Sequence, residues 1–228
     1  MAQTETPSSN SLADDPTLDE IRAALAPRLA GDAAFDGWGK GAVASAASAL
    51  GIDPDIAALA FPGGATDMID AWFGWIDDEM TRRLPPEKLG AMKIRTRIAA
   101  LVETRLEIVE GNIEALRRAL AILAMPQNLA KGAKLGWRAA DTMWRLAGDT
   151  AIDYNHYTKR GLLSAIYAAT LTVFLDDDSE GFADTRAFLS RRIDNVMQFE
   201  KAKAGFLKRR ERIPSLSRFI GRLRYPGV

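Results

Sequence analysis

The sequence predicts an all-α protein of about nine helices followed by an amphipathic tail helix. Apolar residues recur at helical spacing from Leu18 to Leu207, and no segment alternates apolar and polar residues as a half-buried strand does. Most prolines stand between these periodic segments, where helices break. A length of 228 residues suits one large helical domain better than two small ones.

The periodic segments place the helices at about residues 18–30, 37–50, 53–60, 64–84, 87–110, 112–124, 127–147, 150–176 and 182–204. In the N-terminal half, Pro27 is expected to bend the first helix, and Gly51 supplies the turn after the second. Pro62 ends the third helix, and Pro85 and Pro86 end the fourth.

The breaks of the C-terminal half come from different residues. Pro126 separates the sixth helix from the seventh, and Gly148 fits the left-handed residue that ends the seventh. Asp149 or Thr150 can then cap the eighth helix. Three aspartates at 176–178 would oppose the helix dipole at a C-terminus, so we expect them in a loop.

Charge divides the chain into an acidic body and a basic tail. Residues 201–228 carry nine Lys and Arg against one Glu, a net charge of +8, and residues 1–200 therefore carry −8. With the helix pattern, this predicts four regions: a disordered lead at 1–16, a helix-turn-helix-like module at 17–62, a body at 63–204 and a tail at 205–228.

Composition excludes several kinds of site. With no cysteine there are no disulfides, thiolate nucleophiles or thiolate metal sites. Asp153 and His156 have the carboxylate-x-x-His spacing of di-iron bundles, but such a site needs that pair twice and the chain has one histidine. We therefore predict no metal site and no catalytic residue, and an enzyme that uses His156 and Asp153 stays a minor alternative.

No apolar run is long enough to cross a bilayer, since the longest, at 161–175, has 15 residues and suits a buried helix. The first sixteen residues contain no Lys or Arg, unlike a secretory signal or a mitochondrial presequence. These features favour a bacterial cytoplasmic protein.

Residues 18–62 have the layout of a helix-turn-helix, with small residues in the second helix and Gly51 at the turn, and resemble the N-terminal module of TetR-type repressors. Residues 35–61 contain one Lys against three Asp, whereas DNA-binding modules contact phosphates through Lys and Arg. We predict no nucleic-acid partner, and a TetR-type ligand-sensing regulator is the alternative function.

The sequence of the tail predicts a basic amphipathic helix that binds an anionic membrane surface. The alternative is a helix packed on the acidic body. The predicted membrane-binding residues are Phe206, Leu216, Arg218, Phe219, Ile220, Arg222 and Leu223. In the body, the apolar helices form either a filled core or a core with a cavity for a lipid, and periodicity does not separate the two.

Residues 132–160 gather more polar and aromatic side chains than a helix junction needs. Trp137 and Trp144 lie on one helical face with Asp141 between them, and Arg145 follows Asp141 at ion-pair spacing. Tyr, Arg and Asp side chains on consecutive turns are suited to a protein interface.

The same stretch, KLGWRAADTMWRLAGDTAIDYNHYTKRGLLSAIYAATL, together with FLDDDSEGFADTRAFLSRRIDNVMQFEKAKA, resembles the TetR-fold lipid-binding accessory proteins of ubiquinone (coenzyme Q) biosynthesis. The resemblance extends from about Trp38 to Lys203 and includes the pieces ALGI, FPGG, DMI and KIRTRI. His156 stands where many relatives have tryptophan, and Leu146 where some have a larger aromatic residue.

The resemblance implies a TetR-like homodimer without catalysis or cofactor that binds an isoprenoid or phospholipid in an apolar cavity. Its last helix would contact the inner face of the cytoplasmic membrane, and the protein would present a quinone intermediate to a quinone-ring hydroxylase. The resemblance places the partner-binding residues at Met143, Leu146, Asp153, His156, Tyr157 and Arg160.

Overall fold

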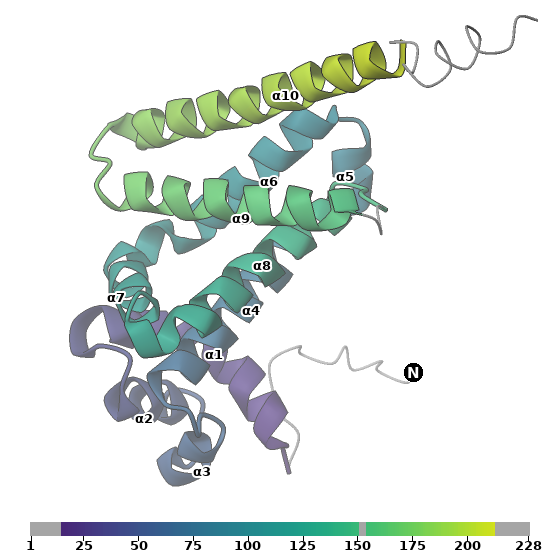
Figure 1. Ribbon diagram of the computed structural model, residues 1–228. Helices are drawn as coiled ribbons and strands as arrows, with labels where there is room; N and C mark the ends of the chain where they lie inside the picture. The colour runs from purple at the N-terminus through teal and green to yellow at the C-terminus, as the bar shows by residue number, and fades with distance from the viewer. Residues whose placement is uncertain (1–14, 151–153, 213–228) are drawn as a thin grey trace, which may run out of the picture.

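The computed structural model describes residues 15–150 and 154–212, and the predicted lead and most of the tail therefore lie outside the described residues. The described chain is all-α, and it has the following α-helices: α1 (Leu18–Asp36), α2 (Lys40–Ser48), α3 (Pro54–Leu59), α4 (Ala65–Arg83), α5 (Pro86–Gly90), α6 (Ile94–Val109), α7 (Ile113–Leu123), α8 (Leu129–Leu146), α9 (Tyr154–Leu175) and α10 (Ala183–Arg212) (Figure 1). The predicted fold class is confirmed.

The helix boundaries differ from the prediction in three places. The predicted helix at 87–110 is two helices, α5 and α6, because the chain turns at Ala91 and Met92 and is extended at Lys93, where ψ is 151°. Helix α1 continues through Pro27 to Asp36. Helix α10 continues to Arg212, so the predicted boundary between body and tail at residue 205 falls inside it.

Helices α1, α2 and α3 form the helix-turn-helix-like module at one end of the molecule. Thr17 accepts from the backbone N–H of Glu20, and the Glu20 carboxylate accepts from the backbone N–H of Thr17, a capping box that begins α1. Gly51 has a φ of 69° at the predicted turn, and Asp53 caps α3 by accepting from the backbone of Asp55. Local sequence therefore fixes the ends of these short helices.

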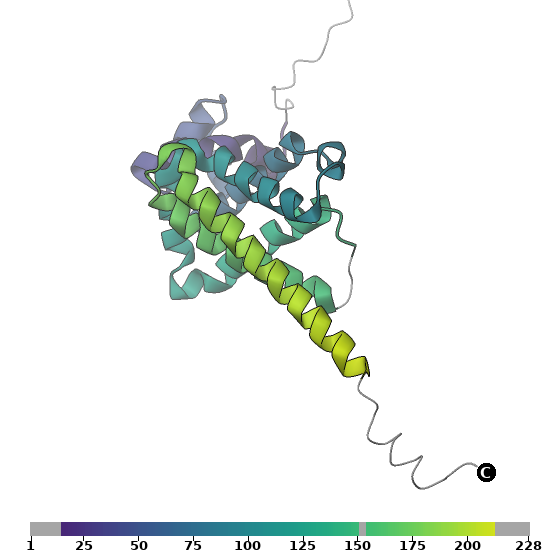
Figure 2. The same ribbon diagram turned by 90° about the horizontal axis from the view of Figure 1, so that it is seen from above.

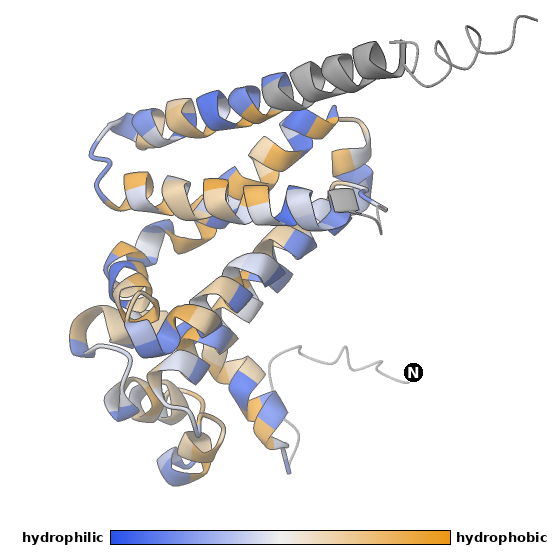
Figure 3. Cartoon of the chain, viewed as in Figure 1, coloured by the Kyte–Doolittle hydropathy of each residue, from blue (hydrophilic) through white to orange (hydrophobic). Residues whose placement is uncertain are grey.

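Helix α4 runs through the centre of the molecule and contacts α1, α6, α7 and α8. Trp72 on α4 is fully buried, and its ring lies 5.3 Å from that of Trp38, whose indole N–H donates to Ala115 O of α7. Each long helix carries hydrophobic and hydrophilic residues, as Figure 3 shows, and the hydrophobic faces meet at this core.

Charged pairs, of which Arg105 and Asp77 are buried and Arg138 is partly exposed, join α4 to α6 and α8. The guanidinium of Arg105 on α6 is buried, pairs with Asp77 of α4 and lies 5.0 Å from the ring centroid of Tyr167. Arg138 of α8 donates to the other oxygen of Asp77 at 3.2 Å and also to Asp70 of α4. Because removal of one partner would leave a charge in an apolar setting, these pairs fix how the three helices sit together.

Helices α9 and α10 form an antiparallel pair over α6 and α8. The aspartates at 176–178 lie between them, as predicted, and Asp177 accepts from Ser179 and from the backbone and hydroxyl of Thr185. The C-terminal part of α10 projects beyond the other helices, as Figure 2 shows.

Candidate functional site

A cavity of about 310 Å³ lies between α6, α8, α9 and α10. This volume is at the low end of the range for small-molecule sites. Most of its lining is aliphatic: Ile94, Ile98, Leu162, Leu163, Ile166, Ile193 and Val196. The cavity can therefore take an apolar ligand.

The cavity exists because four helices turn apolar residues toward a space that their side chains do not fill. Leu162, Leu163 and Ile166 come from one face of α9, at spacings of one, three and four residues. Ile193 and Val196, three residues apart, come from α10 on the opposite side. Sequence reasoning missed these lining residues, because the periodicity of a cavity wall equals that of a packed core.

Polar side chains line the cavity at the junction of α8 and α9. The Lys159 ammonium lies 2.7 Å from Asp149 Oδ1 and 5.3 Å from the centroid of the Trp144 ring. The Trp144 indole N–H donates to the backbone oxygen of Lys159 at 3.0 Å, and Thr158 lines the same region. The prediction that Trp137 and Trp144 share a face is consistent with their contacts, because both contact α9.

A bidentate ion pair holds α10 against α6 beside the cavity. Arg95 donates to the two carboxylate oxygens of Asp194 at 2.6 and 2.8 Å, and to Ser190 Oγ at 3.1 Å. Arg95 also lines the cavity. The fork geometry of the guanidinium fixes the register of α10 over α6.

The turn after α8 is built as the sequence predicts. Gly148 has a φ of 88°, the left-handed conformation that ends a helix. Arg97 of α6 donates to Ala147 O at 2.8 Å and to Met92 O and Gly90 O, so one guanidinium satisfies three carbonyls at the ends of α5 and α8.

Arg160 anchors α9 to this turn from inside the protein. Only 2 % of its side chain is exposed, and it pairs with Asp141 Oδ1 at 2.5 Å and Asp149 Oδ2 at 3.1 Å. Burial alone would raise the pKa of Asp149, but hydrogen bonds from Lys159 and Arg160 lower it overall. The predicted pair of Asp141 with Arg145 is also present, at 2.6 Å.

The residues predicted to contact a partner therefore fall into three groups. Met143 and Arg160 are buried, and Arg160 joins α9 to α8 through its ion pair with Asp141. Leu146 and His156 are partly exposed, and Tyr157 is 63 % exposed. The assignment of these residues to a partner contact stays a prediction, and the burial of Met143 and Arg160 shows that the two side chains pack inside the chain. Asp153 lies outside the described residues.

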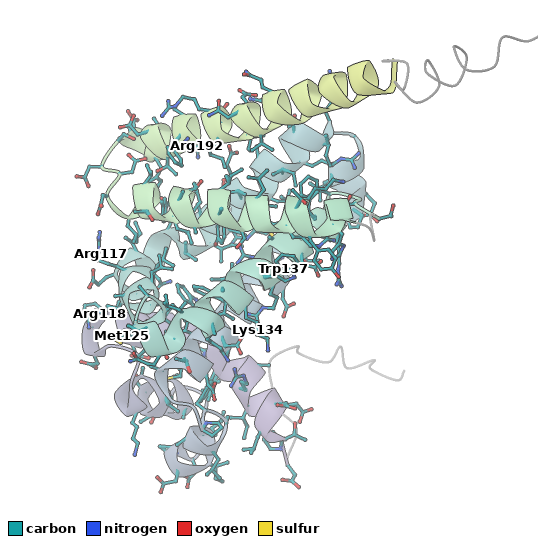
Figure 4. The ribbon with its side chains drawn as sticks, viewed as in Figure 1. Arg117, Arg118, Met125, Lys134, Trp137 and Arg192 are labelled. Carbon is teal, nitrogen blue, oxygen red and sulfur yellow. The ribbon has the colours of Figure 1, made fainter. Side chains whose placement is uncertain are left out.

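Tyr157 belongs to an aromatic cluster at the start of α9. Its ring lies 5.1 Å from the His156 ring and 6.1 Å from that of Trp137 on α8, which Figure 4 labels. Of the cluster of Trp137, His156 and Tyr157, the two α9 residues His156 and Tyr157 lie within one helical turn of Lys159. An exposed group of aromatic rings of this kind is typical of protein interfaces.

The predicted membrane-binding residues at 216–223 lie outside the described residues, and the side chain of Phe206 in α10 does too. Within 15–150 and 154–212, no helix is long and apolar enough to span a bilayer. The same residues hold no cluster of three or more His, Asp and Glu that could bind a metal ion.

Comparison with known proteins gives matches in sequence and in structure. Residues 129–200, from the start of α8 into α10, match the family model described as COQ9. The human protein named "Ubiquinone biosynthesis protein COQ9, mitochondrial" is 36 % identical over 168 residues, which are 71 % of this chain and 52 % of the human protein. The Drosophila melanogaster protein of the same name is 27 % identical over 187 residues, covering 80 % of this chain and 57 % of that protein.

The chain thus spans about half the length of the curated relatives it matches. A solved structure, the TetR transcriptional regulator from Nitrosomonas europaea, superposes with a TM-score of 0.62 at 21 % identity, covering 78 % of this chain and 98 % of that one. At that identity the likeness concerns the fold alone. The resemblance inferred from the sequence is confirmed: this chain is a TetR-fold protein similar to the COQ9 ubiquinone biosynthesis proteins.

Proposed function

We propose that this chain is a lipid-binding accessory protein of ubiquinone biosynthesis that presents a quinone intermediate to a ring hydroxylase at a membrane. The names of its relatives in humans and Drosophila melanogaster supply the pathway. The cavity between α6, α8, α9 and α10 supplies the binding site, and it is the observation that carries the proposal. An aliphatic lining with a few polar side chains suits a lipid with a polar head.

The partner surface in this proposal is the exposed edge of the α8–α9 junction. Tyr157, His156 and Trp137 form its aromatic part, and Leu146 adds a partly exposed apolar side chain. Aromatic side chains provide most of the binding energy in many protein interfaces. Because this surface adjoins the polar end of the cavity, a hydroxylase bound there would meet the ligand.

The remaining parts of the proposal concern location and assembly. The basic tail would hold the protein on the inner face of the cytoplasmic membrane of a bacterium, where an apolar quinone precursor resides. The protein would act as a homodimer without a cofactor or a catalytic residue of its own.

Mass spectrometry of organic extracts from the purified protein tests the cavity. We expect an isoprenoid or a phospholipid to co-purify with the parent chain. Replacement of Ile166 by Trp fills the cavity and should reduce the recovered lipid severalfold. The matched control, Leu129→Trp, changes an exposed residue on α8 and should retain it. Equal lipid in both variants, or none in the parent chain, would contradict the proposal.

Liposome flotation tests the tail. Because α10 continues to Arg212, a chain ending at Arg212 keeps this helix whole, whereas one ending at 204 cuts it. We expect the full chain to float with vesicles that contain anionic lipid and the chain ending at Arg212 to remain in solution. Equal flotation of both would argue against a membrane role for residues 213–228.

A ligand-sensing transcription regulator is the second candidate, favoured by the likeness of the fold to a TetR regulator. In the α1–α3 module, however, Asp53 and Asp55 stand at α3, and Lys40 begins α2. Retention on heparin that is lost on substitution of Lys40, and not on removal of the tail, would favour this candidate.

A further inference from the structure

We propose that the cavity binds its lipid in one direction, with the oxygen-bearing head beside Trp144 and Lys159, and that the Lys159 ammonium is the positioning group that selects this head. The inference rests on the proposed function, in which the cavity holds a lipid. It adds which end of the ligand lies where, which side chain decides it, and which chemistry of head is preferred.

The first observation is that the polarity of the cavity changes along α9. Thr158 and Lys159 line it near the N-terminal end of α9, and only aliphatic residues of α9 line it further along. From Lys159 to Ile166 the helix rises about 10 Å. Trp144, two residues before the last of α8, lies at the same polar end. The other charged lining residue, Arg95, already donates to both carboxylate oxygens of Asp194 and to Ser190 Oγ. A ligand with one polar end therefore has its lowest desolvation cost when that end lies beside Lys159 and Trp144.

The second observation is the state of the Lys159 ammonium. It is fixed in place by Asp149 at 2.7 Å and by the Trp144 ring. An ammonium has three N–H donors, and among the described contacts Asp149 accepts from one of them. Lys159 therefore has donor capacity for a ligand oxygen without a change of rotamer.

The third observation is that the charges around the cavity are balanced. Asp149 pairs with Lys159, and Asp194 pairs with Arg95, the other cation of the lining. A fully anionic head would have to compete with these carboxylates, whereas an uncharged carbonyl or hydroxyl oxygen only accepts a hydrogen bond. The site therefore favours an uncharged head with oxygen acceptors, such as a quinone ring, over a phospholipid phosphate.

Cavity size agrees with this orientation. A volume of about 310 Å³ holds a ring and the first part of a chain, but not a whole long polyprenyl chain. With the ring beside Lys159, it lies within about one helical turn of Tyr157 and His156 along α9. The reacting end of the ligand would then adjoin the proposed partner surface.

Two probes with equal chains test the inference in the full-length protein. Decylubiquinone carries a ring with oxygen acceptors, and decylbenzene carries a ring without them. Dissociation constants are measured by isothermal titration in detergent below its critical concentration. We expect Lys159→Met to weaken decylubiquinone binding at least about tenfold, the effect of losing a hydrogen bond from a charged donor. Decylbenzene binding should change less than about twofold, since no such bond is lost.

Two further variants are matched controls. Lys134→Met makes the same change at an exposed position on α8, labelled in Figure 4, and should leave both dissociation constants unchanged. Lys159→Arg keeps a cationic donor and should retain most of the affinity for decylubiquinone. A tenfold loss in Lys159→Arg as well would point to packing rather than to the donor, and would overturn the proposal.

A second measurement does not depend on a change at Lys159. Quinone rings quench indole fluorescence at contact, so bound decylubiquinone should quench Trp144, and Trp144→Phe should reduce the quenched fraction. An unchanged fraction in Trp144→Phe would place the ring elsewhere and overturn the orientation. If neither probe binds the parent chain, the lipid-binding function itself fails; if both bind and Lys159→Met has no effect, only the orientation fails.

Discussion

The carboxylate of Asp141 has two arginine partners, one buried and one exposed, and the two can be compared by substitution. Asp141 pairs with Arg160, which is 2 % exposed, and with Arg145, which is 73 % exposed. We consider Arg160→Met and Arg145→Met. Methionine keeps most of the apolar stem and removes the guanidinium, so the two variants differ mainly in the burial of the charge that is lost.

The expected loss of stability follows from the contacts of each side chain. Removal of one partner from a buried ion pair costs about 3–5 kcal/mol when the other charge is left unpaired. In Arg160→Met, Asp141 keeps Arg145 and Asp149 keeps Lys159, so we expect a smaller loss, about 2–3 kcal/mol. Arg145→Met removes one exposed pair four residues apart and should cost about 0.5 kcal/mol or less.

Urea unfolding at pH 7, followed by far-UV circular dichroism, measures both free energies of unfolding. The difference between the variants should be at least about 1.5 kcal/mol, with equal dependence on urea concentration. A difference below about 0.5 kcal/mol would refute the reasoning, because it would mean that burial adds nothing to the contribution of Arg160.

Three further predictions concern Gly148, Gly161 and Asp177. Gly148→Ala should destabilise the protein by about 1–2 kcal/mol, because φ is 88° and the new Cβ would lie 3.3 Å from Arg97 Nη1. Thermal unfolding measures this loss of stability. Gly161→Ala, inside α9 with no heavy atom within 4 Å of the new Cβ, should instead stabilise it by about 0.5–1 kcal/mol in the same assay. Hydrogen bonds from Ser179 and Thr185 hold the pKa of Asp177 well below its usual value of 3.8. Ionised Asp177 therefore stabilises the folded state above about pH 3.8, and this contribution is lost as the pH falls through the folded pKa. The difference in free energy of unfolding between the parent chain and Asp177→Asn should thus be largest at neutral pH and should shrink as the pH is lowered. A difference that stays constant with pH would contradict this role of Asp177.

Features that depend on neighbours in the chain were predictable. The left-handed Gly148, the Asp141–Arg145 pair and the loop at 176–178 each depend on residues within about one turn of each other. The split of the predicted helix at 87–110 was missed, because neither a proline nor a left-handed glycine marks the turn at Ala91 and Met92.

The candidate site was only partly predictable. The sequence predicted the α8–α9 junction as the region of interest, and the structure leaves Tyr157 there exposed. Arg160, three residues later, is buried by partners at Asp141 and Asp149, which are 19 and 11 residues away. Helical spacing predicts which residues share a face of a helix, but it does not predict which face another helix covers.

The sequence by itself therefore determined the all-α class, most of the breaks between helices and the absence of thiol chemistry, because these follow from residue type and short-range spacing. Only the tertiary structure decided that α6, α8, α9 and α10 enclose a cavity and that Lys159 and Trp144 meet at one end of it. It also placed Arg97 at the end of α8, 50 residues further along the chain. The physical reason is that an unfilled space and a long-range contact depend on how helices distant in sequence pack, which periodicity leaves open.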